Sequence, residues 1–185
     1  MTNTNMFRTA GRFRYGYAPD QVDTFFTHAR RAYEGDQSEP MTGSDVRRAA
    51  FDVVRGGYVT SSVDAALDRL ERAFAARERS EFVATHGQQA WMEQVAAQAR
   101  TLYDRLRRPD GERFAPARRG EQAYDPVDVD ALCHRLIDYF DKGTPLTSDE
   151  VRQTTFGRAR GHHGYAEGPV DAFCDRAVEV LLGVE

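Results

Sequence analysis

The adjacent histidines His162 and His163 are the strongest candidates for metal ligands in this sequence. Glu167 and Cys174 follow them and would supply a carboxylate and a thiolate, which zinc also accepts. No recognised zinc-ligand spacing connects these residues, however, and glycines stand close to the histidine pair on both sides. We therefore expect an exposed, glycine-flanked loop here, with no bound metal or other cofactor.

The residue patterns of common catalytic sites do not stand out either. The sequence shows no serine–histidine–aspartate order, no glycine-rich phosphate loop, no HExxH helix and no paired catalytic carboxylates. Cys133 and Cys174 lie in predicted helices outside any CxxC motif, which is typical of buried thiols in a reducing compartment. The sequence thus predicts a protein that is not an enzyme.

The net charge and the hydropathy of the sequence indicate which partners and which cellular location to expect. The net charge is -4, which argues against broad nucleic-acid binding because such proteins carry a strongly basic face. The segment Met1 to Met6 is polar, and no apolar run approaches the roughly 18 residues of a membrane span. We expect a cytoplasmic protein, and we expect any membrane contact to be peripheral, at the inner face.

One pattern recurs four times: a phenylalanine, a loop rich in glycine or arginine, a tyrosine, and Val-Asp five residues later at the start of an apolar helix. The four copies place these residues at Tyr17, Val22 and Asp23; at Tyr58, Val63 and Asp64; at Tyr124, Val129 and Asp130; and at Tyr165, Val170 and Asp171. The offset between copies one and three and between copies two and four is 107 residues (17 to 124 and 58 to 165). The unit of duplication is therefore a pair of copies.

Copies two and four begin with a further short helix. Thr147 and Glu150 have the spacing of a capping box, in which each side chain bonds the backbone N–H of the other residue, and Thr42 with Asp45 is a weaker version. The Asp125-Pro126 dipeptide predicts another helix start, with aspartate as the N-cap. We expect the four repeat tyrosines to pack their loops onto such helix starts.

A long apolar pattern connects the two pairs. Residues 62–107 predict one long helix or two nearly collinear helices, with apolar steps of three and four that favour coiled-coil-like packing and a kink at Gly87. The resulting stripe fits an internal core or a homodimer seam. We predict an all-α fold in which tandem short helix-loop-helix repeats flank one long central helix, with domains at residues 1–108 and 109–185.

The combination of a Leu-Thr-x-x-Glu-Val-Arg-like helix start, Gly-Tyr and Val-Asp resembles the N-terminal domain of the DivIVA family, most closely actinobacterial DivIVA domain repeat proteins. The resemblance extends from Phe7 to Leu182. It implies a scaffold linked to bacterial cell division and polar or envelope growth, which binds the inner face of the membrane and recruits other proteins.

In that family a phenylalanine in the loop before Gly-Tyr inserts into lipid beside a basic residue. The resemblance therefore implies a lipid contact at Phe13 and Arg14 in copy one. The corresponding loops of copies two and four carry Arg55, or Arg158 and Arg160, without an aromatic residue. Copy three has Arg118-Arg119 and lacks the glycine before its tyrosine.

We expect a non-enzymatic, DivIVA-like adaptor whose partners are other proteins, with an anionic membrane surface and a second copy of the chain as further candidates. The alternative is a protein–protein adaptor with no membrane role. A third hypothesis is a DNA-associated regulator, because a short helix, a glycine turn and a second helix resemble a helix-turn-helix that would present Arg47, Arg48 and Arg55.

Overall fold

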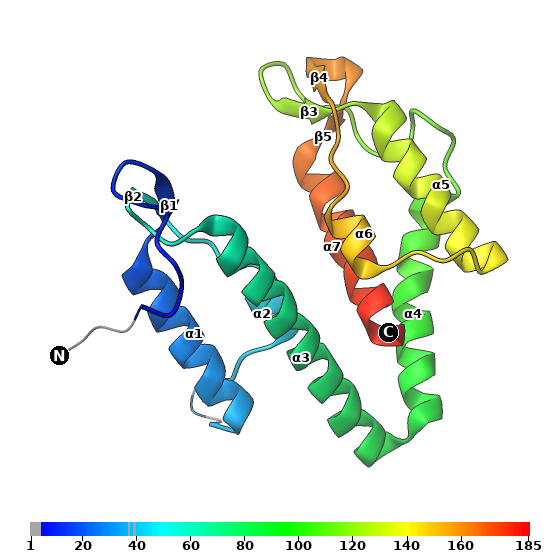
Figure 1. The fold of residues 1–185 in the computed structure, drawn as a ribbon. Helices are drawn as coiled ribbons and strands as arrows, with labels where there is room; N and C mark the ends of the chain where they lie inside the picture. Colours follow the sequence, from blue (N-terminus) through cyan, green and yellow to red (C-terminus); the bar gives the residue numbers. More distant parts are fainter. Residues whose placement is uncertain (1–4, 37, 39) are drawn as a thin grey trace. The chain divides into compact units, whose positions relative to one another are not determined.

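The computed structural model describes residues 5–36, 38 and 40–185 and divides the chain into two compact units, Met1–Glu81 (unit 1) and Phe82–Glu185 (unit 2). Each unit contains one pair of repeats (Figure 1). The division lies 27 residues before the expected boundary at 108 (108 against 81). The reason is that the second half of the predicted long helix packs within unit 2.

Unit 1 is built from helices and two short strands. Its elements are β1 (Tyr15–Tyr17), α1 (Pro19–Glu34), α2 (Gly43–Arg47), β2 (Val53–Arg55) and α3 (Thr60–His86), the last of which continues past Glu81. β1 pairs antiparallel with β2, so that Tyr17 stands opposite Val53. The two strands lie together at one end of α1 and α3 (Figure 1).

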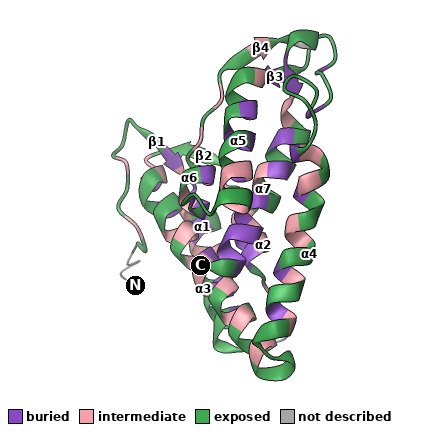
Figure 2. Cartoon of the chain, turned by 90° about the vertical axis from the view of Figure 1, so that its right-hand side faces the viewer, coloured by how far each residue is buried: buried purple, intermediate pink, exposed green. Residues whose placement is uncertain are grey.

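Unit 2 repeats this plan and adds one helix. Its elements are α4 (Gln88–Leu106), β3 (Gln122–Tyr124), α5 (Pro126–Lys142), α6 (Ser148–Arg152), β4 (Arg158–Arg160), the 3-10 turn η1 (Gly161–His163), β5 (Tyr165–Ala166) and α7 (Glu167–Val184). The strand order is β4-β3-β5, and both pairings are antiparallel. α7 is the most deeply buried helix of this unit (Figure 2).

The prediction of a mostly helical chain is confirmed, but the fold is not purely α-helical. Among the described residues there are five strands of two or three residues each, in two small sheets. They form because the loop before each tyrosine is extended and finds the matching loop of the other copy in its unit. In residues 53–55 the β-branched pair Val-Val precedes two glycines, a pattern that favours a strand before a turn.

The prediction of one long or collinear helix is wrong. The helix breaks at Gly87, which has a φ of 87° that disfavours other residues. The rings of Phe82 and Trp91 then meet with centroids 5.5 Å apart, whereas nine residues of continuous helix would span about 13.5 Å. Trp91 also donates its indole N–H to the Gly183 carbonyl at 2.8 Å. The apolar stripe of α4 is therefore internal core of unit 2, facing α7.

The predicted helix starts are present. Thr42 with Asp45, and Thr147 with Glu150, each form a reciprocal capping box. The Asp125 carboxylate accepts the Val127 backbone N–H at 2.9 Å, as an N-cap residue does. These bonds satisfy N–H groups that a helix leaves free at its first turn.

The tyrosines and aspartates of the repeat are exchanged between the two copies of each unit. Tyr58 of copy two donates its hydroxyl hydrogen bond to Asp23 of copy one at 3.0 Å, and Tyr17 of copy one is hydrogen-bonded to Asp64 of copy two. Unit 2 repeats the exchange, with Tyr124 bonded to Asp171 at 3.1 Å and Tyr165 to Asp130 at 3.2 Å. Each tyrosine thus packs on the helix start of the other copy.

The phenylalanines are exchanged in the same way. Every repeat tyrosine contacts the phenylalanine of the paired copy, with ring centroids 5.1 to 5.5 Å apart. These ring pairs are Tyr58 with Phe7, Tyr17 with Phe51, Tyr165 with Phe114 and Tyr124 with Phe156. Aromatic pairs in such tilted geometries add about 0.5–1.5 kcal/mol to the burial of their surfaces.

The backbones of the two copies approach closely where the tyrosines cross. In unit 1 the N–H of Tyr17 donates to the carbonyl of Tyr58 at 3.0 Å, and the reverse bond is 2.8 Å long. A Cβ on Gly16 would lie 2.1 Å from the Tyr58 oxygen, and one on Gly57 would lie 2.4 Å from the Gly16 oxygen. Only glycine fits at either place, which explains why glycine precedes these tyrosines.

The two exchanged tyrosines of one unit should differ in their effect on stability. Tyr58 is fully buried, and its hydroxyl also accepts the Met6 N–H, whereas the Asp64 partner of Tyr17 is exposed. Tyr58→Phe should lower the free energy of unfolding by roughly 1.5–3 kcal/mol, the range for a hydrogen bond to a charged group, and Tyr17→Phe by less. Urea unfolding followed by circular dichroism measures both. No loss for Tyr58→Phe would contradict the exchange, and equal losses would contradict the difference between the two bonds.

The same bonds predict how stability depends on alkaline pH. Burial, and then the neighbouring aspartate, raise the pKa of Tyr124 to about 12, and burial raises the pKa of Tyr17, Tyr58 and Tyr165. A raised pKa favours the neutral phenol, so this stabilisation is complete below the ordinary pKa of 10 and is lost as pH rises through the folded-state value. Tyrosinate absorbance should therefore appear together with unfolding. Asp171→Asn should lower the pKa of Tyr124 while leaving that of Tyr58 unchanged.

Candidate membrane and partner surfaces

The histidines and cysteines that could hold a metal or act as nucleophiles lie in different environments. His162 and His163 are exposed on η1 with ring centroids 4.0 Å apart, in a loop two residues longer than the Gly56-Gly57 turn of unit 1. No group of three or more metal-binding side chains occurs in the part of the chain that the structure describes. Burial raises the pKa of Cys133 and Cys174 to about 12, which keeps both thiols protonated and poorly nucleophilic.

The strands of each unit end in a tight turn, and we call these regions the tips. The unit 1 tip is residues 11–17 and 53–55, and the unit 2 tip is residues 118–124 and 158–163. Each tip contains a turn closed by a backbone bond of 3.0 Å, from the Arg14 N–H to the Gly11 carbonyl and from the Glu121 N–H to the Arg118 carbonyl. The offset of 107 residues makes the two turns equivalent positions of one scaffold.

The unit 1 tip exposes apolar side chains. Phe13 is 85% exposed, more than any other large apolar residue of the described chain, and Tyr15 and Val53 are 61% and 57% exposed. The Arg55 guanidinium donates to the Tyr15 hydroxyl at 3.3 Å and lies over its ring at 5.6 Å. The proposed contact residues Phe13, Arg14 and Arg55 are thus on one tip.

Such a tip has the chemistry of an interfacial membrane contact. Aromatic rings and valines gain free energy when they leave water for the boundary between headgroups and acyl chains. Arginines beside them can extend their stems along that boundary and keep their charges at the phosphates. Each arginine close to an anionic surface contributes about 1 kcal/mol.

The unit 2 tip is polar and basic. Gly120 stands where unit 1 has Phe13, Gln122 where it has Tyr15, and Arg158 where it has Val53. None of the large apolar side chains that are exposed in the described chain lies on this tip. The structure places Arg158 and Arg160 on one strand, β4, next to the Arg118-Arg119 turn.

Sequence reasoning missed part of the unit 1 tip. Tyr15, Val53 and Val54 are exposed beside the predicted contact residues but were not singled out. The signal that could have identified them is the short Val-Val-Arg segment before Gly-Gly, which is typical of a strand followed by a turn. The segment brings its side chains to Tyr15 only because β2 pairs with β1, and a local pattern does not reveal that pairing.

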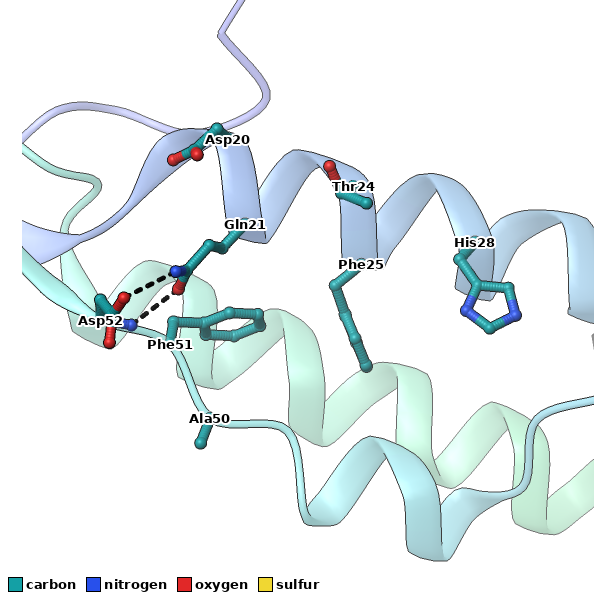
Figure 3. Close-up of a pocket in the computed structure, with 8 residues that line it drawn as sticks. All are labelled: Asp20, Gln21, Thr24, Phe25, His28, Ala50, Phe51 and Asp52. Carbon is teal, nitrogen blue, oxygen red and sulfur yellow. Dashed lines mark hydrogen bonds between the residues drawn. The ribbon is translucent and has the colours of Figure 1, made fainter.

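A groove on the side of α1 is a separate feature of unit 1 (Figure 3). It holds about 600 Å³ and has Phe25 and Phe51 as apolar lining, with Asp20 and Asp52 at its margin. The Gln21 amide donates to the Asp52 carboxylate and accepts the Asp52 N–H, both at 2.8 Å. This reciprocal pair fastens the segment before β2 to α1, so we interpret these polar groups as structural.

The arginines proposed for DNA contact are engaged within unit 1. Arg47 pairs with Glu71 at 2.7 Å, and both side chains are almost inaccessible. Arg48 donates to the Ser44 hydroxyl at 2.9 Å. α2 is only five residues long, and it packs with its one buried valine, Val46, toward Phe74. Nothing in this arrangement presents a free basic recognition helix.

In residues 5–36, 38 and 40–185 no helix combines the length and the apolar character needed to cross a bilayer. The chain matched no family model, no curated protein and no solved structure with which it was compared.

Proposed function

We propose that this protein is a non-enzymatic, DivIVA-like adaptor that rests its unit 1 tip on the anionic inner surface of the bacterial membrane. Its process would be cell division or polar and envelope growth, as the resemblance of the repeats implies. The observation that carries the proposal is Phe13, which is 85% exposed at the outermost turn between Arg12 and Arg14. A large apolar side chain is rarely left so exposed at a tip unless something covers it.

The contact would combine two weak contributions. Burial of one phenylalanine contributes about 1.5–3 kcal/mol, and each nearby arginine adds about 1 kcal/mol at an anionic surface. Their sum gives reversible binding by one tip. A homodimer, which remains a prediction for this chain, would place two tips on one membrane and raise the avidity without new contacts.

A protein–protein adaptor with no membrane role is the second candidate. The unit 2 tip favours it, because that tip has the same scaffold and lacks every exposed apolar side chain of the unit 1 tip. The DNA-regulator hypothesis is weaker, because Arg47 is engaged with Glu71. The two leading candidates differ in one measurable property, which is binding to lipid.

Vesicle co-sedimentation tests the lipid contact. The full chain should sediment with vesicles that contain phosphatidylglycerol and should stay in the supernatant with phosphatidylcholine alone. Phe13→Ala combined with Arg14→Ala should lower the partition coefficient roughly thirtyfold or more, because the lost burial and charge amount to roughly 2–4 kcal/mol.

Val127→Ala provides the matched control. Val127 is 75% exposed on α5 and belongs to neither tip, so its loss should leave sedimentation unchanged. Equal sedimentation of the wild type and the tip variant would remove the unit 1 tip as the lipid contact. No sedimentation of the wild type at all would favour the adaptor without a membrane role.

A further inference from the structure

β4 has a free edge. In the three-stranded sheet of unit 2, β3 is central, β5 lies on one side of it and β4 on the other. The outer side of β5 is already occupied, because Tyr165 forms a bridge with Pro116. Nothing in the described chain pairs with the outer side of β4. A strand with a free edge can accept another strand.

The register shows which backbone groups face outward. The Asp125 N–H donates to the Gly157 carbonyl at 2.8 Å, so alternation along the antiparallel ladder makes Ala123 and Ala159 the next bonded pair. The N–H and C=O groups of Arg158 and Arg160 then point away from β3. The Arg160 carbonyl stands at the start of η1, where it accepts the first i→i+3 bond of the turn. The outward groups left for a partner are therefore the N–H and C=O of Arg158 and the N–H of Arg160.

The side chains of β4 divide between the two faces of the sheet. Ala159 faces inward, since a Cβ on Gly164 would lie 2.5 Å from the Ala159 Cβ. The alternation of a strand places Arg158 and Arg160 together on the other face, where both are exposed. A shallow groove of about 280 Å³ runs along this part of β3 and β4.

The arginines of this tip have no partner in the described chain. The guanidinium groups of Arg158, Arg160, Arg118 and Arg119 make no hydrogen bond or ion pair there. The nearby Glu121 is occupied by the Arg118 backbone N–H at 2.8 Å. Four of the other eight arginines of unit 2 pair with an acid, as Arg113 does with Asp130 at 2.8 Å. Four unpaired cations therefore gather at one tip of a chain whose net charge is -4.

We propose that the edge of β4 binds an extended acidic segment of a partner protein as an added strand. The N–H and C=O groups of Arg158 and the outward N–H of Arg160 pair with the backbone of that segment. Carboxylates at alternate positions of the segment lie on the face of the two guanidiniums and form charge-assisted bonds with them. This site goes beyond the membrane contact and does not depend on it.

The contrast with unit 1 favours a polypeptide over a membrane as the occupant. β2 has the same position in its unit, but Val53 replaces Arg158, and the tip around it exposes large apolar side chains such as Phe13. The unit 2 tip has no exposed large apolar side chain to insert, and its outward backbone groups match a strand and not a layer of headgroups. An acidic segment bound as a strand would contact both the guanidinium charges and the outward backbone groups of β4.

Fluorescence anisotropy with a defined probe tests this site. The probe is a labelled, end-capped peptide in which glutamate alternates with valine, titrated into the full chain that carries Phe13→Ala. We expect saturable binding that weakens about tenfold or more with Arg158→Val plus Arg160→Val. The same loss should follow N-methylation of alternate peptide nitrogens, which blocks edge pairing. Arg100→Ala, an exposed arginine of α4, is the control and should leave the affinity unchanged.

Three outcomes would overturn the proposal: no saturable binding of the peptide, equal binding of the N-methylated peptide, or displacement of the peptide by phosphatidylglycerol vesicles, which would make the tip a lipid site. Valine favours strands, so the double variant is expected to fold, and its urea midpoint checks this. Every peptide-binding measurement uses the chain with Phe13→Ala. A failure of peptide binding therefore does not affect the vesicle result for the unit 1 tip, and a failure of vesicle binding does not affect the peptide result.

Discussion

The hydrogen bond from each repeat tyrosine to the aspartate of the paired copy is the interaction on which this structure depends. One copy alone has one or two strands of three residues or fewer and one or two α-helices, which is too little to bury a core or to pair its own strands. In the pair, Tyr58 is fully buried against the other copy and its hydroxyl is bonded to Asp23. The pair is therefore the smallest unit that completes its hydrogen bonds, which agrees with the duplication of pairs at a constant offset.

The same exchange leaves the tips free to differ. The phenylalanine, tyrosine and aspartate contacts lie at the helix starts, and they are the same in both units although the side chains exposed at the tips differ. Phe13 and Gly120 occupy equivalent turns, as do the strand residues Val53 and Arg158. The contacts that hold each unit together do not involve the exposed side chains of the tips. The tip of unit 1 can therefore expose apolar side chains while the tip of unit 2 is polar and basic. This separation of roles is what the proposed adaptor function requires.

Local signals in the sequence predicted local structure well. The capping boxes at Thr42 and Thr147 and the helix start at Asp125 are short-range patterns, and the structure has all three. Gly87 was correctly predicted as the interruption of the long pattern, but the fold-back that follows it was not. That reversal depends on Trp91 reaching Gly183, 92 residues away in the sequence.

The features that sequence reasoning missed are those that involve a choice of partner. Four equivalent tyrosines and four equivalent aspartates do not show by spacing alone which pairs form, so Tyr17 with Asp64 could not be separated from Tyr17 with Asp23. The strands are too short to show an alternation of apolar and polar residues in the sequence. They form only because two copies pair with each other. Tyr15 and Val53 were likewise recognised as part of the unit 1 tip only from the pairing of β1 with β2.

Ring-to-ring nuclear Overhauser effects test the exchange most directly. In the full chain with phenylalanine and tyrosine rings selectively labelled, the account predicts contacts from Phe7 to Tyr58 and from Phe51 to Tyr17. Contacts within a copy, from Phe7 to Tyr17 and from Phe51 to Tyr58, in place of the exchanged ones would contradict it.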